Sequence, residues 1–552
     1  MNGHIRVRQR RRQGPGFCRP RRFGLAVIFL AVGIQSCSIG DLKTEHVVMV
    51  NGRGDLIDPR GNWGDPDNRK HLYFFPYDRL GDHESYFARV FDGLERIEPR
   101  EGGKRKRILL FVHGGLNTAQ ASISRAAELT HRIFEEGTYP IFLNWDSSLT
   151  SSYLEHLVLL RQGRRIDDWC CEAFKEKYPN AGYMAGGFGV LASVVTTPFY
   201  LAMDLTRGIF RLPVDLYGVY GELLSSHWRS GRTSETEGRD PWPDGDCSKD
   251  ADVGLTPRAD QLICEYRHPE TGPEAASKPY PIAQGGDERT TWESVKQAGL
   301  TTLTIPAHLV TGLVVDVGGT GSWSSMRRRT TAMFHRDKDL RAPDPHVEPS
   351  GGVSLFMTAL REYLHKNGGK DEWEVVLVGH SMGTIVANEM VRQFGHHLED
   401  DPQRRPLFDS IIFMAAACSL RDYLDTIPQY LEVYKTSKMY HLTLHDQAES
   451  TEQTFWVTLP GSLLVWIDGF FSRPDSALDL VAGRYQNLLR IMHIHRPGVR
   501  DRVTIKAFNF GAETELKNPQ THGDFGEFPF WRETFWAVGE GPPFEEERIS
   551  TD

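Results

Sequence analysis

The sequence predicts an α/β fold: a doubly wound, mostly parallel sheet with a large, mainly helical insertion. Two short apolar runs, Ile108 to Val112 and Ile141 to Trp145, alternate with helical patterns, and a third run, Val375 to Val378, leads into a glycine turn. About 230 residues separate Trp145 from Val375, whereas a βα connection needs a dozen or more. We therefore expect one α/β core that an insertion divides into two parts.

The first part of the core is expected over residues 38–145. A helix is predicted near Glu84 to Ile97, and the strand Ile108 to Val112 then ends in His113-Gly114-Gly115. A helical pattern over Ala119 to Glu136 leads to the second strand, Ile141 to Trp145. Strand, glycine turn, helix and strand is the pattern of a parallel βαβ unit.

The insertion is expected over residues 146–350. Two apolar stretches lie in it, Met184 to Thr206 and Leu300 to Val317, and they flank a Gly/Pro/Asp-rich region, about 230–289, that is typical of loop or disorder. We expect the apolar stretches to form a cap over the active site. They could also form an element that lies in a membrane interface, and the two interpretations overlap because one segment can do both. A membrane span is disfavoured by the glycines, Pro198 and Asp204 within the first stretch.

The second part of the core is expected over residues 351–552. Its predicted elements, in order, are helix Leu355 to His365, strand Val375 to Val378, helix Thr384 to Phe394, strand Ile411 to Ala417, helix Tyr423 to Tyr434, strand Tyr440 to Leu444, helix Ala477 to Met492 and strand Val503 to Phe508. These elements complete the doubly wound sheet.

Residues 1–37 have the layout of an export signal. Eight arginines fall within the first 22 residues, and the apolar run Gly24 to Ile34 follows. The tail Ile34-Gln35-Ser36-Cys37 resembles the lipobox of bacterial lipoproteins, although Gln35 stands where a small residue is usual. This resemblance implies an exported protein anchored on the periplasmic side of a membrane by an acylated Cys37. The alternative is a membrane-anchored or disordered basic tail with an incidental cysteine.

Composition narrows the possible partners. The formal net charge is -9, and no basic helix or aromatic-interleaved basic stripe indicates nucleic-acid binding, so we expect a small or lipidic partner. Seven cysteines are too few for a disulfide framework. Cys247 and Cys264 could pair if the chain is exported, while Cys170, Cys171 and Cys418 fit buried thiols. No cluster has metal-ligand spacing, and no cofactor or metal is expected.

The run Gly379-His380-Ser381-Met382-Gly383 is the strongest functional signal. A Gly-x-Ser-x-Gly run suits a sharp strand-to-helix turn that projects the serine above the sheet, and here a strand precedes it and a helix follows it. Ser381 is the expected nucleophile. The amides of Gly115 and Met382 are expected to stabilise an oxyanion, with Leu116 as an alternative to Gly115.

These pieces resemble the α/β-hydrolase superfamily in its lipase and esterase branch, over about 107–145 and 373–536. The resemblance places the acid after the strand Tyr440 to Leu444, where Asp446 is the first choice and Glu449 and Asp422 are alternatives. It places the base after the last strand, where His522 lies. The other downstream histidines, His441, His445, His493 and His495, lie on strands, at a strand edge or at the opposite end of the sheet.

The resemblance implies a serine hydrolase that cleaves carboxylic esters, including lipid esters, through a Ser381-His522-Asp446 triad and an acyl-enzyme. Thioesterases, acyltransferases and peptidases use the same triad, so the substrate stays open at this point. A non-catalytic scaffold on a hydrolase fold, with the apolar insertion as its docking surface, is the alternative from another class. The expected partners are an ester substrate and a membrane surface. We expect the protein to contact the membrane through its N-terminal anchor and the insertion.

Overall fold

The computed structural model describes residues 44–57, 83–99, 105–117, 119–161, 164–165, 195–214, 216–218, 220–221, 282–284, 312–313, 315–335, 350–399, 401–452, 460–491, 494–511 and 517–536. Several sequence predictions lie outside these residues: the export signal with Cys37, the cysteines 170, 171, 247 and 264, about half of the first apolar stretch of the insertion and most of the second. They stay predictions.

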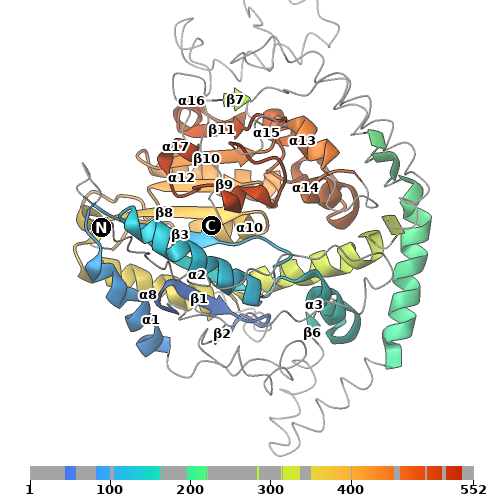
Figure 1. The fold of residues 1–552 in the computed structure, drawn as a ribbon, viewed down its shortest axis with the longest axis horizontal. Helices are drawn as coiled ribbons and strands as arrows, with labels where there is room; N and C mark the ends of the chain where they lie inside the picture. The colour runs from blue at the N-terminus through green and yellow to red at the C-terminus, as the bar shows by residue number, and fades with distance from the viewer. Residues whose placement is uncertain are drawn as a thin grey trace, which may run out of the picture. The chain divides into compact units, whose positions relative to one another are not determined.

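A single large sheet organises the described residues (Figure 1). Its strands are β1 (Val47–Val50), β2 (Leu56–Ile57), β3 (Lys106–Val112), β4 (Thr138–Trp145), β7 (Ile282–Gln284), β8 (Trp373–His380), β9 (Ser410–Met414), β10 (Lys438–Thr443) and β11 (Val503–Ala507). The order is β2-β1-β4-β3-β8-β9-β10-β11-β7, and every neighbouring pair is parallel except β1 with β2. The α/β class is confirmed.

The middle of the sheet explains why the apolar runs are continuous rather than alternating. From Arg107 onward every residue of β3 is buried, and β3 pairs with β4 on one side and β8 on the other. A parallel strand with helices on both faces has no solvent side, so both of its faces carry apolar residues. Each of these three strands coincides with a run that the sequence predicts, with longer bounds.

Helices cover both faces of the sheet. One layer contains α1 (His83–Asp92), α8 (Gly352–Lys366), α10 (Gly383–Phe394) and α12 (Ile427–Val433), which contact one another in part and contact β1, β3 and β8. On the opposite face, α2 (Ala119–Glu135) packs against β4, and the segment leading to α17 (Glu533–Trp536) stacks Phe530 on Phe111 of β3 at 4.6 Å between ring centroids. The predicted helices near 84–97, 119–136, 355–365 and 384–394 are confirmed within a few residues.

Three strands of this sheet were not expected from the sequence, and neither were β5 (Leu160–Arg161) and β6 (Arg164–Arg165), which form a separate antiparallel pair. β1 and β2 are too short to show a periodic pattern, and β7 lies in the stretch interpreted as loop or disorder. β7 pairs in parallel with β11 at the sheet edge, so part of the insertion belongs to the core sheet. Backbone hydrogen bonds create such a three-residue edge strand, and they leave no signal in side-chain composition.

Two predicted helices are interrupted. The stretch 423–434 contains α11 (Leu420–Leu424) and α12, which begins with a proline in its first turn. A proline lacks the amide that would continue α11, so the helix must restart there. The stretch 477–492 contains a short 3₁₀ helix, η8 (Ala477–Asp479), and α15 (Tyr485–Ile491).

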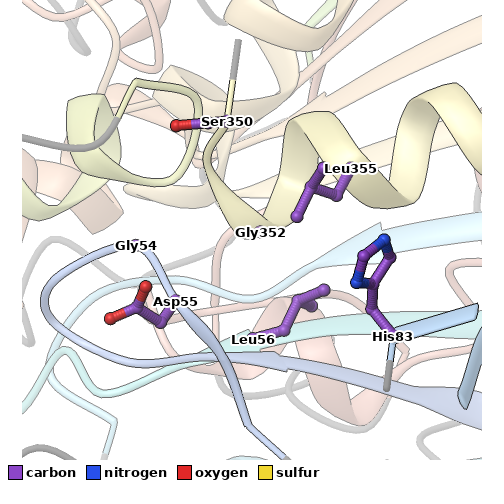
Figure 2. A pocket seen from close by; sticks show the side chains of 7 residues that line it. All are labelled: Gly54, Asp55, Leu56, His83, Ser350, Gly352 and Leu355. Atoms are coloured by element: carbon purple, nitrogen blue, oxygen red, sulfur yellow. The ribbon is translucent and has the colours of Figure 1, made fainter. Parts of the chain in front are cut away.

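The turn between β1 and β2 packs against the start of α8. Gly54 has φ +83°, and its carbonyl accepts a hydrogen bond from the Gly352 amide at 2.7 Å. Figure 2 shows the small pocket that His83 and Leu355 line beside this turn. Its volume of about 10 Å³ holds at most one water molecule, so it is no candidate for a substrate site.

The described part of the insertion consists mainly of two helices, over 195–214 and 315–332. None of the helices in the described ranges is both long and apolar enough to cross a membrane. Gly208 of the first helix lies against Val317 of the second and against Leu313, which precedes the second helix. That the insertion caps the active site stays a prediction.

Candidate active site

Ser381 lies in the tight turn between β8 and α10. Its φ of +50° is in the left-handed region that non-glycine residues rarely adopt. The turn is held by hydrogen bonds from the Ser381 amide to the Met414 carbonyl, 2.9 Å, and from the Ala417 amide to the Ser381 carbonyl, 3.1 Å. A backbone conformation of this kind is costly and persists only where its surroundings hold it in place.

Packing leaves no room for a side chain at Gly383 and little room at Gly379. A Cβ on Gly383 would lie 2.2 Å from the Val112 carbonyl oxygen of β3. A Cβ on Gly379 would lie 3.0 Å from Cα of Thr384. The start of α10 can therefore approach β3 at Gly383, and the end of β8 at Gly379, because these positions have no side chain, which explains the residue types of the motif.

His522 contacts Ser381 directly. Its Nε2 lies 2.8 Å from Ser381 Oγ, a hydrogen-bond distance, and both residues are buried. His522 follows β11, so the two residues lie 141 positions apart in the chain but meet beyond the carboxyl ends of parallel strands. The sequence-based pairing of Ser381 with His522 is present in the geometry; their roles in catalysis stay a prediction.

The backbone of His522 is held at both of its polar groups. Its amide donates to Glu452 Oε2 at 2.8 Å, and its carbonyl accepts from Nε2 of His380 at 3.0 Å. The ring centroids of His380 and His522 lie 5.3 Å apart. Because a carbonyl only accepts, the neutral His380 must carry its proton on Nε2. His380, the residue before Ser381 in the motif, thereby holds the loop that carries His522 in place.

Burial controls the protonation of this cluster. It lowers the pKa of His380 to about 4 and that of His522 well below the ordinary value of 6.5, so both are neutral near pH 7. Burial also raises the pKa of Glu452 to about 7, although the His522 amide opposes this shift. A neutral His522 beside a serine hydroxyl can accept its proton.

The glycine turn after β3 lies against Ser381. A Cβ on Gly114 would lie 2.8 Å from Cβ of Ser381, and one on Gly115 would lie 3.4 Å from Cβ of Met382. His113 anchors this turn: its Nε2 accepts from the Trp145 amide at 2.9 Å, and its Nδ1 donates to the Gly114 carbonyl at 2.6 Å. Burial lowers the pKa of His113 to about 4, which keeps it in this neutral form.

His113 also sets the direction of the Gly115 amide. The Gly114 carbonyl points to His113 and Ser147, whose hydroxyl donates to it at 3.2 Å. In a trans peptide the next N–H points the opposite way, away from these donors. Among the hydrogen bonds of the described residues, none uses the amide of Gly115 or Met382. The Leu116 amide donates to the Ser147 carbonyl at 2.9 Å, which removes Leu116 as the alternative donor.

The structure does not bring an acid to the second nitrogen of His522. Nδ1 is buried and has no hydrogen-bond partner among the described residues, so neither Asp446 nor Glu449 contacts it. Asp446 is the first residue of α13 (Asp446–Thr451), directly beyond β10 as expected, and Glu449 is bonded to the Ser462 hydroxyl. Asp422 lies in the first turn of α11 (Leu420–Leu424), where its carbonyl accepts from the Asn388 side chain.

A cavity of about 750 Å³ opens beside His522. Its walls come from the glycine turn after β3, one face of α2, the ends of β3 and β4, and the 521–530 segment. Phe111, Phe142 and Leu129 make part of it apolar, while Glu452 and Arg125 add charge. The volume lies in the range of small-molecule sites.

Sequence reasoning missed two residues of this site, His380 and Glu452. His380 is visible in the motif, but its contact with His522 depends on a loop 142 residues later. Glu452 lies beyond the loop in which an acid was sought. The histidines set aside by position are elsewhere: His441 and His495 are buried near Tyr423, and His445 caps α13; His493 lies outside the described residues.

No group of three or more His, Cys, Asp or Glu side chains suited to a metal ion occurs in the part of the chain that the structure describes. Comparisons with protein-family models, with curated proteins and with solved structures find no match. The assignment of function therefore depends on the geometry of Ser381, His522 and their neighbours.

Proposed function

We propose that this protein is a serine hydrolase of the α/β-hydrolase type that cleaves carboxylic esters. The observation that carries the proposal is the 2.8 Å contact between Ser381 Oγ and His522 Nε2 at the strand-to-helix turn of a parallel sheet. A serine hydroxyl is a weak nucleophile unless a neighbouring base removes its proton. This chemistry needs a serine in a sharp turn, where glycines on both sides leave room for the backbone, beside a neutral histidine. Ser381, with a left-handed backbone conformation, and the buried His522 have this arrangement.

In the proposed reaction Ser381 Oγ attacks the ester carbonyl carbon while His522 Nε2 takes the hydroxyl proton. The amides of Gly115 and Met382 stabilise the negative charge on the carbonyl oxygen. The C–O bond to the alcohol breaks, and His522 gives the proton to the leaving alkoxide. Water then attacks the acyl-enzyme by the same route, releasing the acid and restoring Ser381.

Asp446 is the proposed acid of the triad. Its position immediately after β10 supports this role. Because Nδ1 of His522 has no partner among the described residues, the proposal requires that its contact with Asp446 forms when substrate binds. Catalytic hydrogen bonds are often long or misaligned without substrate and tighten in the complex. Until then Glu452 and His380 keep His522 in place through its backbone.

The cavity beside His522 supports an ester with an apolar acyl group as substrate. Its aromatic side chains can bury hydrocarbon, each CH₂ contributing roughly 0.8 kcal/mol. Lipid esters fall within this class, and thioesters or acyl transfer would use the same atoms.

A fluorophosphonate probe tests the nucleophile. The probe phosphonylates an activated serine, so we expect wild-type protein to be labelled at Ser381 and the Ser381→Ala variant to show no label. Ser151 provides a matched control because it is equally buried and stands outside the proposed site; Ser151→Ala should label like wild type. Labelling of the Ser381→Ala variant, or none of wild type, would contradict the hydrolase proposal and favour the scaffold.

We also propose export and acylation at Cys37, on the basis of the lipobox-like run before it. Bacteria that express the protein and are fed labelled palmitate should incorporate label into the wild type and not into Cys37→Ala. Equal incorporation in the two proteins would refute acylation at this residue.

A further inference from the structure

The helix over 195–214 exposes an apolar face. Eight of the twelve large apolar side chains that are exposed among the described residues lie in 195–217, so this surface is concentrated rather than scattered. They are Val195, Phe199, Leu201, Leu205, Ile209, Phe210, Val214 and Tyr217. Phe199 and Phe210 are 70% and 80% exposed, values that a buried core helix would not show.

The opposite face of this helix is fixed to the rest of the protein. Asp204 contacts His156 at 3.1 Å, and the Thr197 hydroxyl donates to the Leu157 carbonyl at 3.1 Å. A Cβ on Gly208 would lie within 3 Å of Leu313 and Val317, so glycine allows the close approach of the 315–332 helix. The helix is therefore held with its apolar face outward.

The charges on the helix favour an anionic partner. Arg207 and Arg211 are exposed and one turn apart, although Arg211 also interacts with the buried Asp316. Within 195–217 the sequence has two acidic residues: Asp204, whose side chain is 15% exposed and faces His156, and Asp215, which lies outside the described residues. In the described helix over 195–214, exposed apolar residues lie beside two exposed arginines and the one acid is paired with His156, a pattern typical of helices that lie in a membrane interface.

The 315–332 helix connects this surface to the candidate active site. Near one end it contacts Gly208 through Val317, and further along Met326 lies 3.7 Å from the Cβ position of Gly115. A lipid surface on the 195–214 helix would thus lie one helix away from the proposed oxyanion turn.

We propose that the apolar face of residues 195–217 docks in the plane of an anionic lipid surface. The phenylalanines enter the boundary between headgroups and acyl chains, and Arg207 contacts lipid phosphates. The helix lies on the membrane without crossing it. This inference is independent of the proposed hydrolase activity, because docking requires no turnover.

Vesicle sedimentation tests the docking with the full chain. All proteins carry Cys37→Ala, so that the proposed acyl chain does not contribute, and the basic N-terminal segment is common to all of them. We expect Phe199→Ser/Phe210→Ser to weaken binding to phosphatidylcholine/phosphatidylglycerol vesicles by at least about tenfold. Val433→Ser, at a 70% exposed position on α12, is the matched control and should bind like its parent.

Hydrogen exchange locates the contact without substitution. Peptides that span 195–217 should exchange more slowly with anionic vesicles and unchanged with buffer or phosphatidylcholine alone. Equal binding by the double variant and its parent overturns the proposal, as does an absence of vesicle-dependent protection in these peptides. A dimer in buffer that the double variant converts to a monomer, with vesicle binding unchanged, would assign the face to a second copy instead.

Discussion

Replacing His522 with alanine is expected to lower kcat for a p-nitrophenyl ester by about 10⁴- to 10⁶-fold with little change in KM. Without Nε2 at 2.8 Å from Ser381 Oγ, no group in contact takes the hydroxyl proton. Ser381→Ala should lose a similar factor. Because both residues serve one step, the double variant should be no slower than the slower single variant, since only oxyanion stabilisation and binding remain.

Steady-state kinetics of the three variants measures this non-additivity. His131→Ala is the control, because His131 is exposed and pairs with Glu135 on α2, away from Ser381; its kcat should match wild type. Losses that multiply in the double variant would show that His522 and Ser381 act in separate steps. A His522→Ala enzyme with near-normal kcat would contradict the assignment of His522 as the base.

The sequence predicts the sheet and the turn at Ser381 well because both depend on local patterns. β3, β4 and β8 are buried on both faces, so each is a continuous apolar run, and the turn at Ser381 needs glycine at two fixed positions. His522 could be found only through the family resemblance. Its place after the last long strand is a matter of topology, which the chain order alone does not display.

The supports of His522 could not be predicted. His380 and Glu452 bind its backbone, and any residue at position 522 offers the same amide and carbonyl. Such contacts are set by where a loop folds back, not by side-chain pattern. The absence of a partner at Nδ1 of His522 could not be predicted either: Asp446 lies at the expected strand end, as the first residue of α13, but chain order does not say which way its side chain points.

Replacing His441 with phenylalanine is expected to change how stability depends on pH. His441 is 1% exposed, lies 4.6 Å from the Tyr423 ring, and neither ring nitrogen has a partner among the described residues. Burial, with a smaller effect of His495, lowers its pKa to about 3. Below pH 6.5 the unfolded chain binds a proton at His441, and the folded chain does not. As the pH falls from 7 to 5, the free energy of unfolding of wild type should therefore decrease by about 2 kcal/mol relative to that of the variant.

Replacing Glu449 with glutamine is expected to have the opposite pH dependence. Glu449 is fully buried, and burial raises its pKa to about 8. A folded-state pKa above the unfolded value of about 4.5 gives stability that is present at low pH and is lost as the pH rises through 8. As the pH rises from 6 to 8, the free energy of unfolding of wild type should therefore decrease by about 2 kcal/mol relative to that of Glu449→Gln.

Urea unfolding at a series of pH values measures both differences. Each variant is compared with wild type at the same pH. Burial also shifts the pKa values of His113, His380 and Glu452, but their contributions to the free energy of unfolding are common to both proteins and cancel to first order. Parallel pH curves for wild type and His441→Phe would mean that His441 is accessible to protons in the folded state. Parallel curves for Glu449→Gln would mean that water or a cation stabilises the Glu449 carboxylate. Slopes of opposite sign are the expected result, because burial disfavours the charged form of both groups, and these two groups ionise in opposite directions.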